Sequence, residues 1–473
     1  MSRRAEVVVV GAGISGLTTA FWLHRSGVDV TVLEREKWVG GTMRTLRTDG
    51  WLVEMGPNSA LETTPLFSEM FDALGISGQR MYASSESNRR YILRGGLLHA
   101  LPMSPGAFLK TRLWSTRAKL RLLREPFTGR AGKEESIAEF VERRLGSEFL
   151  DYAINPFVAG VYAGNPEDLS VRLAFPKLFA LEEKYGGLVK GMILGARDRR
   201  KRAETAKDRA RMFSFVSGMQ TFPDAIAEVL ADRVELAAAV ISVGRVRGAT
   251  EHGTKGLEVT YERDGEKRAL TADAVILAVP AYTASMILRN LSAHTADRLD
   301  AVYYPPVAEV FLGFHEDQFT MALDGFGYLV PAKESCNVLG TIWSSSIFPG
   351  RAPEGHVALT TFVGGARQPG LLDGDDDHIM RLVLDDINSI MGVRGQPVFT
   401  RSIRWRRAIP QYNLGYQSLL TSLEELERDV PGLFLCSNYR GGIAVGDCVM
   451  SGKSTATRAE DYVSAQSGIR HKH

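Results

Sequence analysis

The stretch EVVVVGAGISGLTTAFWLHRSGVDVTVLE, residues 6–34, decides the fold. Residues 6–10 are a largely β-branched run, which is typical of a buried strand. The segment 17–27 predicts a helix that ends at a glycine, and 28–34 predicts a second strand that ends in an acid. Together they predict a βαβ unit of about 30 residues with a right-handed crossover.

The glycines of GAGISG, Gly11, Gly13 and Gly16, predict a dinucleotide site between the strand and the helix. A pyrophosphate approaches closely where the backbone lacks Cβ atoms, and the helix N-terminus offers free N–H groups and positive potential. Glu34, about 20 residues further on, is placed to accept hydrogen bonds from both ribose hydroxyls, which favours FAD or NAD over NADP. The alternative is a glycine turn in an ordinary βαβ unit, which this context disfavours.

Two further glycine-rich segments fit a flavin better than a nicotinamide. Gly40 and Gly41 let the chain pass close to the phosphates, and Arg44 adds charge, whereas the alternative is a plain surface turn. The segment GGIAVGDC, residues 441–448, precedes a final helix from about Asp447 and aims a second helix N-terminus at the flavin ring. Asp447 itself is interpreted as a helix N-cap rather than a catalytic acid.

Composition places the chain among ordinary globular proteins. Its 473 residues predict two or three domains, and 44% hydrophobic with 24% charged residues is close to the globular average. A net charge of +2 gives no global argument for nucleic acid. Three cysteines indicate a reducing compartment, and neither a signal peptide nor an apolar run near 18 residues is seen. We therefore expect a cytoplasmic protein.

The segment 101–124 differs from its surroundings because it carries six bases, no acid and many leucines. Such a stretch suits a surface that rests on anionic lipid, on the inner face of the cell membrane. The alternative is a solvated amphipathic helix that packs on its own domain. The segment 197–211 is mostly charged and is interpreted as a solvated loop or an exposed helix.

In its motifs the chain resembles the oxygen-dependent protoporphyrinogen oxidase family, which includes the bacterial coproporphyrinogen III oxidases. GAGISGL and GGTMRT are shared with all monoamine-oxidase-like flavoproteins, whereas YAGNPEDLS, GFGYLVP and IPQYNLG are specific to the porphyrinogen branch. The motifs run in order over nearly the whole chain: GAGISGL, GGTMRT, GPNS (56–59), NRRYIL (88–93), VAGVYAGNPEDLS (158–170), GFGYLVP (325–331), TTFVGGARQP (360–369), IPQYNLGY (409–416) and GGIAVGDC.

The resemblance implies an α/β fold with α+β insertions. Because the first and last segments of the chain both look nucleotide-binding, the Rossmann-like FAD-binding domain is expected to be discontinuous. We expect it to comprise 1–95, 208–280 and 400–465. A mixed-sheet substrate domain is expected over 281–399, and a helical membrane-associating insertion over 101–207.

The resemblance also assigns roles to individual residues. Arg90 matches an arginine that pairs with a substrate propionate, although neighbouring Arg89 is a second candidate. Apolar residues sandwich the tetrapyrrole and two glycines lie where the macrocycle passes: Phe326, Leu329, Phe362, Gly160 and Gly164. The implied FAD contacts are Gly11, Ala12, Gly13, Ile14, Ser15, Gly16, Glu34, Arg35, Gly41, Thr42, Gly56, Pro57, Asn58, Ser59, Val240, Trp405, Ile443, Ala444 and Val445. From the residues alone, core packing is favoured for Leu329 and Phe362, whereas for Arg90 a surface cation and a ligand-binding cation are equal alternatives.

The implied function is a six-electron oxidation of a porphyrinogen, protoporphyrinogen IX in the first instance. Each two-electron step sends a hydride to flavin N5, and dioxygen accepts the electrons to give hydrogen peroxide. No Ser/His/Asp or Cys/His nucleophile pattern and no zinc-type spacing is found, so we nominate no catalytic residue and no metal ligand. The site is expected to work by positioning its substrate and excluding water. Expected partners are the porphyrinogen, dioxygen, a peripheral membrane contact through 101–124 and a second copy in a homodimer.

Three alternatives stay open at this point. Coproporphyrinogen III differs from protoporphyrinogen IX at two peripheral groups, and one chain does not separate them. An amine oxidase or carotenoid desaturase shares the fold, although Ile443 and Ala444 follow the paired glycines where some amine oxidases attach flavin through a cysteine. A carrier of the GDP-dissociation-inhibitor type keeps the dinucleotide fold without redox chemistry, and the glycine boxes argue against it.

Overall fold

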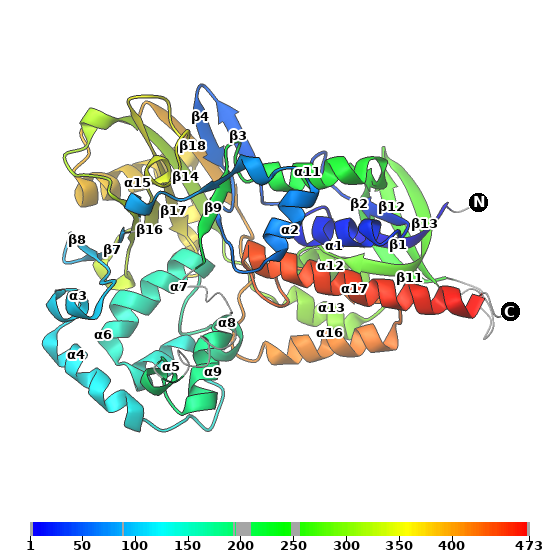
Figure 1. Ribbon diagram of the computed structural model, residues 1–473, viewed down its shortest axis with the longest axis horizontal. Coiled ribbons are helices and arrows are strands. Elements are labelled where there is room, and N and C mark those ends of the chain that lie inside the picture. Colours follow the sequence, from blue (N-terminus) through cyan, green and yellow to red (C-terminus); the bar gives the residue numbers. More distant parts are fainter. Residues whose placement is uncertain (1–2, 88, 193, 195–209, 247–255, 471–473) are drawn as a thin grey trace.

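The computed structural model describes residues 3–87, 89–192, 194, 210–246 and 256–470. Figure 1 shows two parts side by side. One part surrounds helices α1 and α17 and lies near both termini, and the other carries a second sheet above a group of helices.

The part near the termini is built on a seven-stranded mixed sheet. Strands from distant segments of the chain pair in it, because β1 lies between β2 and β13, and β13 also pairs with β19. The neighbouring parallel strands are β10 (Val234–Glu235), β2 (Val30–Leu33), β1 (Arg3–Val10), β13 (Glu266–Leu277) and β19 (Leu433–Leu435). From β13 the sheet continues antiparallel through β12 (Leu257–Arg263) and β11 (Ala239–Arg245).

Helices cover both faces of this sheet, which explains why residues 7–10 are all buried valines. Side chains alternate between the faces of a strand. Val7 and Val9 pack towards α1 (Ile14–Arg25), α11 (Thr221–Leu230) and α17 (Val445–Arg470). Val8 and Val10 belong to the core that includes α12 (Ala281–Leu288), α13 (Ala293–Asp300) and α16 (Gln417–Asp429).

The second part is a seven-stranded sheet of mainly antiparallel strands. Its order is β18 (Phe399–Trp405), β14 (Val307–His315), β17 (His356–Gly364), β16 (Val338–Ile342), β15 (Gly325–Leu329), β7 (Arg89–Arg94) and β8 (Leu97–Ala100). Helix α15 (Asp376–Met391) covers the face that carries Val310 and Leu312. The opposite face carries Phe311 and packs on the hairpin of β3 (Thr45–Thr48) and β4 (Trp51–Glu54).

The membership of two strands differs from the predicted boundaries. Strands β7 and β18 belong to the second sheet, whereas the ranges 1–95 and 400–465 were expected in the cofactor domain. Their partners β15 and β14 lie far away in sequence, and local patterns carry no information on such pairing. The remaining extent of the predicted domains stays a prediction.

Below the second sheet in Figure 1 lies the helical insertion, with α3 (Pro105–Lys110), α4 (Thr116–Arg121), α5 (Ile137–Arg144), α6 (Ser147–Phe149), α7 (Asn155–Tyr162), α8 (Val171–Ala174) and α9 (Pro176–Tyr185). Arg144 of α5 links distant parts of this insertion, since its buried guanidinium forms ion pairs with Glu125 at 3.0 Å and with Glu182 of α9 at 2.6 Å. Most of the charged segment 197–211 lies outside the described residues. The smaller elements are α2 (Leu66–Ala73), α14 (Ser344–Ile347) and a sheet of β5 (Ala60–Leu61), β9 (Met212–Phe215) and β6 (Arg80–Tyr82).

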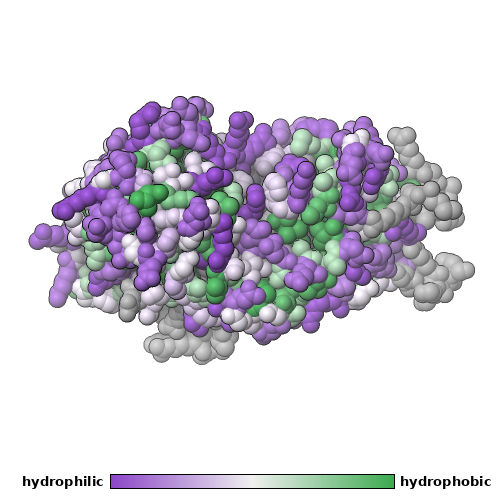
Figure 2. All heavy atoms as spheres, turned by 90° about the horizontal axis from the view of Figure 1, so that it is seen from above, coloured by the Kyte–Doolittle hydropathy of each residue, from purple (hydrophilic) through white to green (hydrophobic). Residues whose placement is uncertain are grey.

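In the described part of the chain, no helix has the length and apolar character needed to span a bilayer. Hydrophilic side chains cover most of the face seen in Figure 2, and apolar side chains are exposed there in separate groups over both parts of the molecule.

Candidate active site

The first glycine motif forms a cradle that is tightly packed on one side and open on the other. A Cβ on Gly11 would meet the Ala278 carbonyl oxygen at 2.7 Å, and a Cβ on Gly16 would meet the Gly11 carbonyl oxygen at 2.0 Å. A Cβ on Gly13 would meet no atom within 4 Å. Packing therefore requires two of the glycines, while the third borders open space at the N-terminus of α1.

Glu34 is held at the end of β2 by backbone donors. Its carboxylate accepts a hydrogen bond from the Ala12 N–H at 2.6 Å and another from the Glu36 N–H at 2.9 Å. The side chain is 8% exposed, and each carboxylate oxygen retains a lone pair. This is the arrangement that ribose hydroxyls require. Ala12 is thus placed behind the acid instead of on the cavity wall.

The second glycine box closes on the first. The Gly40 N–H donates to the Ala12 carbonyl at 2.8 Å, and a Cβ on Gly41 would approach the Gly13 Cα to 3.3 Å. The Arg44 guanidinium lies over the Trp38 ring, 4.2 Å from the ring centre, and its buried Nε has no hydrogen-bond partner in the described part of the chain. An unpaired buried donor beside an open glycine cradle fits a phosphate group.

These elements surround a cavity of about 380 Å³, within the range of small-molecule sites. Of the predicted cofactor residues, those that line it are Gly11, Gly13, Ile14, Ser15, Glu34, Arg35, Gly41, Thr42, Pro57, Val240, Trp405, Ile443 and Val445. Gly16 lies in the packing behind the cradle, and Asn58 and Ser59 line a different, smaller cavity. The wall also includes Tyr282 and Arg407, and the Arg407 guanidinium lies 4.6 Å from the centre of the Tyr282 ring. Neither residue was predicted from the sequence. The only signal for Arg407 was its place two residues after Trp405.

The C-terminal glycine segment enters the same cavity. Gly441 and Gly442 have positive φ angles of 92° and 125°, and the Gly442 N–H donates to the Tyr412 hydroxyl at 3.0 Å. That hydroxyl donates in turn to the Asn438 carbonyl at 2.6 Å. Helix α17 already begins at Val445, so the N-cap interpretation of Asp447 is wrong. Asp447 lies in the first turn, and its carboxylate accepts a hydrogen bond from the Ala444 N–H at 3.4 Å.

Arg90 and Phe326, both predicted substrate contacts, lie together. Parallel pairing of β7 with β15 sets Arg90 beside Gly327, and the guanidinium lies 5.6 Å from the centre of the Phe326 ring. Arg89 forms an ion pair with Asp324, while Arg90 forms no ion pair with any residue in the described part of the chain. Of the two candidates, Arg90 is therefore the cation left for a ligand.

The other predicted substrate residues meet between α7 and the second sheet. A Cβ on Gly160 would approach the Leu329 Cδ2 to 2.4 Å, and a Cβ on Gly164 would approach the Gln411 Oε1 to 2.4 Å. Phe362 is half-buried and packs on a small cluster with Ala159. Packing within the protein thus accounts for both glycines, and their closeness to a macrocycle stays a prediction.

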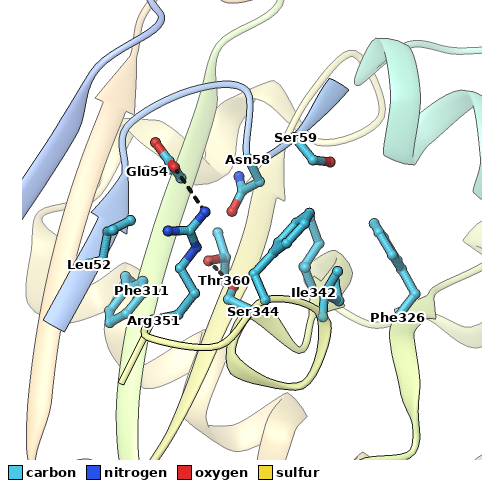
Figure 3. A pocket seen from close by; sticks show the side chains of 12 residues that line it. Leu52, Glu54, Asn58, Ser59, Phe311, Phe326, Ile342, Ser344, Arg351 and Thr360 are labelled. Carbon is cyan, nitrogen blue, oxygen red and sulfur yellow. Dashed lines mark hydrogen bonds and ion pairs between the residues drawn. The ribbon is translucent and has the colours of Figure 1, made fainter. Parts of the chain in front are cut away.

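A second, small cavity lies between predicted cofactor and substrate residues, since its walls include Asn58 and Phe326. Figure 3 shows Arg351 reaching across it towards Glu54, at 3.7 Å. Both side chains are almost fully buried. Burial raises the pKa of Glu54 to about 7 against the opposing effect of Arg351, and burial lowers the pKa of Arg351. This pair was not predicted, because neither residue belongs to a recognisable sequence motif and the two lie far apart in the chain.

The chain is similar to known proteins over nearly its whole length. The profile described as flavin containing amine oxidoreductase matches residues 14–459. Protoporphyrinogen oxidase 2, chloroplastic/mitochondrial, from Arabidopsis thaliana is 32% identical over 97% of this chain and 94% of its own length. Coproporphyrinogen III oxidase from Bacillus subtilis (strain 168) is 28% identical over 97% of this chain and 99% of its own length. These matches confirm the resemblance inferred from the motifs.

Solved structures confirm the fold class. A crystal structure from Exiguobacterium sp. 255-15 superposes with a TM-score of 0.80 at 24% identity and covers 97% of this chain and 99% of its own. A variant of putrescine oxidase superposes with a TM-score of 0.71 at 18% identity, covering 98% and 100%. At these identities the likeness concerns the fold alone.

Proposed function

The chain belongs to the flavin-containing amine oxidoreductase family, and from that premise we propose that it oxidises a porphyrinogen, protoporphyrinogen IX, with dioxygen as the electron acceptor. Membership of this family confirms that the chain is a flavin-dependent oxidoreductase and that its cofactor is a flavin. The proposal rests above all on the full-length similarity to named protoporphyrinogen oxidases.

The residues of the large cavity fit FAD. The cradle at Gly13 is open, the Arg44 Nε has no partner among the described residues, and the Glu34 carboxylate, fixed by backbone donors, could accept hydrogen bonds from a ribose. When bound, the flavin supplies the two-electron acceptor. Val445 places the N-terminus of α17 at the cavity wall, where its positive potential stabilises negative charge. The Tyr412 hydroxyl holds the preceding turn in place.

The substrate would lie between α7 and the second sheet. A porphyrinogen is a large apolar ring with carboxylates, so its site needs apolar walls and a fixed cation. Phe326, Leu329 and Phe362 supply apolar surface, and Arg90 supplies a cation that no carboxylate of the described chain neutralises. A propionate would form a charge-assisted hydrogen bond with it.

Coproporphyrinogen III is the second candidate substrate, because the chain is also similar over its whole length to coproporphyrinogen III oxidases. The test is to incubate holoenzyme with each porphyrinogen in air and to follow porphyrin fluorescence together with hydrogen peroxide. Three peroxides per porphyrin are expected, because six electrons leave in two-electron steps. Absence of both products with either substrate would refute the function, and conversion of one substrate alone would identify it.

We further propose that the helical insertion rests on an anionic membrane. Its surface exposes large apolar side chains, including Met103 at 79%, Leu109 at 71% and Leu123 at 70%, between the bases of the segment 101–124. Apolar side chains flanked by bases suit an anionic interface. Flotation with vesicles is expected to retain the protein on anionic lipid and not on neutral lipid. Homodimer formation stays a prediction, and sedimentation of the purified protein tests it.

A further inference from the structure

An acidic residue lies inside the second sheet, on the face directed towards the β3–β4 hairpin. Glu309 of β14 is directly opposite Phe362 of β17 and opposite Ile403 of β18. Residues opposite one another on adjacent strands share a face of the sheet. Glu309 therefore lies beside Phe362, a predicted substrate contact, and on the face that also carries Trp405, a predicted cofactor contact.

The Glu309 carboxyl is buried and forms no ion pair with any residue that the structure describes. The residue is 5% exposed, and its Oε2 has no hydrogen-bond partner among the described residues. Burial of a carboxylate without a counter-charge disfavours the charged form. Burial accordingly raises the pKa of Glu309 to about 8, a shift that the nearby Trp405 indole, whose N–H donates to the Met55 carbonyl at 3.0 Å, opposes and the charge of Glu54 reinforces.

Glu54 of the hairpin is a second buried carboxyl within electrostatic reach of Glu309. Its oxygens accept hydrogen bonds from the Met219 N–H at 2.9 Å and from the Thr45 hydroxyl at 2.7 Å. The charged groups that act on Glu54 are Arg351 and, more weakly, Arg47, and both favour its anionic form. The two carboxyls thus differ, because cations of the described chain act on Glu54, whereas none of them forms an ion pair with Glu309.

The small cavity of Figure 3 lies between Glu54 and predicted site residues. Phe311, which shares a face of β14 with Glu309, is also part of the wall of this cavity. The cavity is bounded by Glu54 and Arg351 on one side and by Asn58 and Phe326 on the other. Its volume of about 10 Å³ is close to the minimum for one water molecule. A single water there would have polar partners on both sides.

We propose that Glu309 and Glu54 form a proton-holding pair that takes up the proton lost by the substrate in each two-electron step and returns it when dioxygen is reduced. This role rests on the proposed function. Two buried carboxyls that interact electrostatically titrate as a unit, so one can stay protonated while the other is charged. The pair can therefore both accept a proton and release one.

The proton and electron count closes over one step. A ring C–H bond breaks and its hydride passes to the bound flavin, while an N–H bond breaks and its proton forms an O–H bond on the pair. Dioxygen then takes two electrons and two protons to become hydrogen peroxide. One of these protons arrives with the hydride, and the pair releases the other, so the pair returns to its starting state.

The variants Glu309→Gln and Glu54→Gln test the pair in the holoenzyme. The rate of anaerobic flavin bleaching by a porphyrinogen is measured between about pH 6 and pH 9. We expect each variant to lower the rate about 100-fold and to abolish its pH dependence, with KM and FAD affinity within about twofold of wild type. In Glu54→Gln the new side-chain amide can still accept from the Met219 N–H and can donate to the Thr45 hydroxyl, so the fold is expected to persist.

Asp386→Asn is the matched control. The Asp386 carboxylate accepts hydrogen bonds from the Asn337 N–H at 2.7 Å and the Val338 N–H at 2.9 Å. It lies on α15, which covers the opposite face of the same sheet. This variant is expected to keep the wild-type pH profile, which separates loss of the pair from a general loss of stability.

Infrared spectroscopy of the flavin-free protein supplies a readout independent of activity. A protonated-carboxyl band should disappear as the pH rises through about 8, and the Glu309→Gln variant should lack it. An unchanged band, or a wild-type pH profile in both variants with normal flavin reduction, would overturn the pair alone. If no porphyrinogen reduces the wild-type flavin at any pH, the proposed function and this role are overturned together.

Discussion

Replacing Gly13 by valine should separate cofactor binding from folding. Gly13 has φ −70° and ψ 172°, which any residue adopts, and its Cβ would meet no atom within 4 Å. The folded apoprotein should therefore change in stability by no more than about 1 kcal/mol. The isopropyl group would instead occupy the space in which the FAD pyrophosphate approaches the N-terminus of α1.

The magnitude follows from the hydrogen bonds that a displaced pyrophosphate would lose. A hydrogen bond to a charged group contributes about 1.5–3 kcal/mol. Loss of two at this terminus costs about 4 kcal/mol, which weakens the Kd for FAD by roughly 1000-fold. Titration of apoprotein with FAD, followed by flavin fluorescence, measures the Kd. Thermal denaturation of the apoprotein measures stability.

Gly16→Ala is the matched comparison within the same motif. Its Cβ would lie 2.0 Å from the Gly11 carbonyl oxygen, so this variant should destabilise the apoprotein itself. FAD binding by Gly13→Val with wild-type affinity would refute the location of the pyrophosphate. Equal stability of the two apoproteins would refute the packing argument.

Three further predictions concern single side chains. Glu54→Gln should reduce the pH dependence of apoprotein stability, because the folded pKa of about 7 lies above the unfolded 4.5 and Glu54 therefore costs wild type about 3 kcal/mol of stability as pH rises through this range. Urea denaturation at several pH values measures the difference, and the contribution of Glu309 should remain in the variant. Arg90→Ala should raise KM for the porphyrinogen more than it lowers kcat, because it removes binding shared by ground and transition states. An unchanged KM in steady-state kinetics would show that another residue pairs with the propionate. Tyr412→Phe removes the acceptor of the Gly442 N–H and should weaken FAD binding by about 1 kcal/mol, roughly fivefold; an unchanged Kd in a flavin titration would show that the turn is held without it.

The sequence predicted the strand–helix–strand unit of residues 6–34 because its signals are local. The strand, glycine motif, helix and terminal acid of residues 6–34 are contiguous, so each constrains the next. The structure adds why the glycines differ: Gly16 is required by packing and Gly13 is not. The turn at Gly265 between β12 and β13 was likewise predictable, because a hairpin is specified by its own few residues.

Long-range pairing and buried charge were not predictable in the same way. The place of β7 in the second sheet depends on β15, and nothing within residues 89–94 indicates that partner. Glu309 looks like an incidental acid in an apolar strand until its neighbours Phe362 and Ile403 are known. An acid within an otherwise buried strand was the available signal, since carboxylates are rarely buried without a role or a partner.

A single-turnover experiment without oxygen tests most directly whether the bound flavin oxidises a porphyrinogen. Purified holoenzyme is mixed with protoporphyrinogen IX, coproporphyrinogen III or a primary amine, and flavin absorbance is followed in a stopped-flow instrument. We expect a porphyrinogen to bleach the flavin absorbance rapidly and the amine to leave it unchanged. The yellow colour should return when air is admitted. Bleaching by the amine alone, or a purified protein that contains no flavin and binds none, would contradict the proposed function.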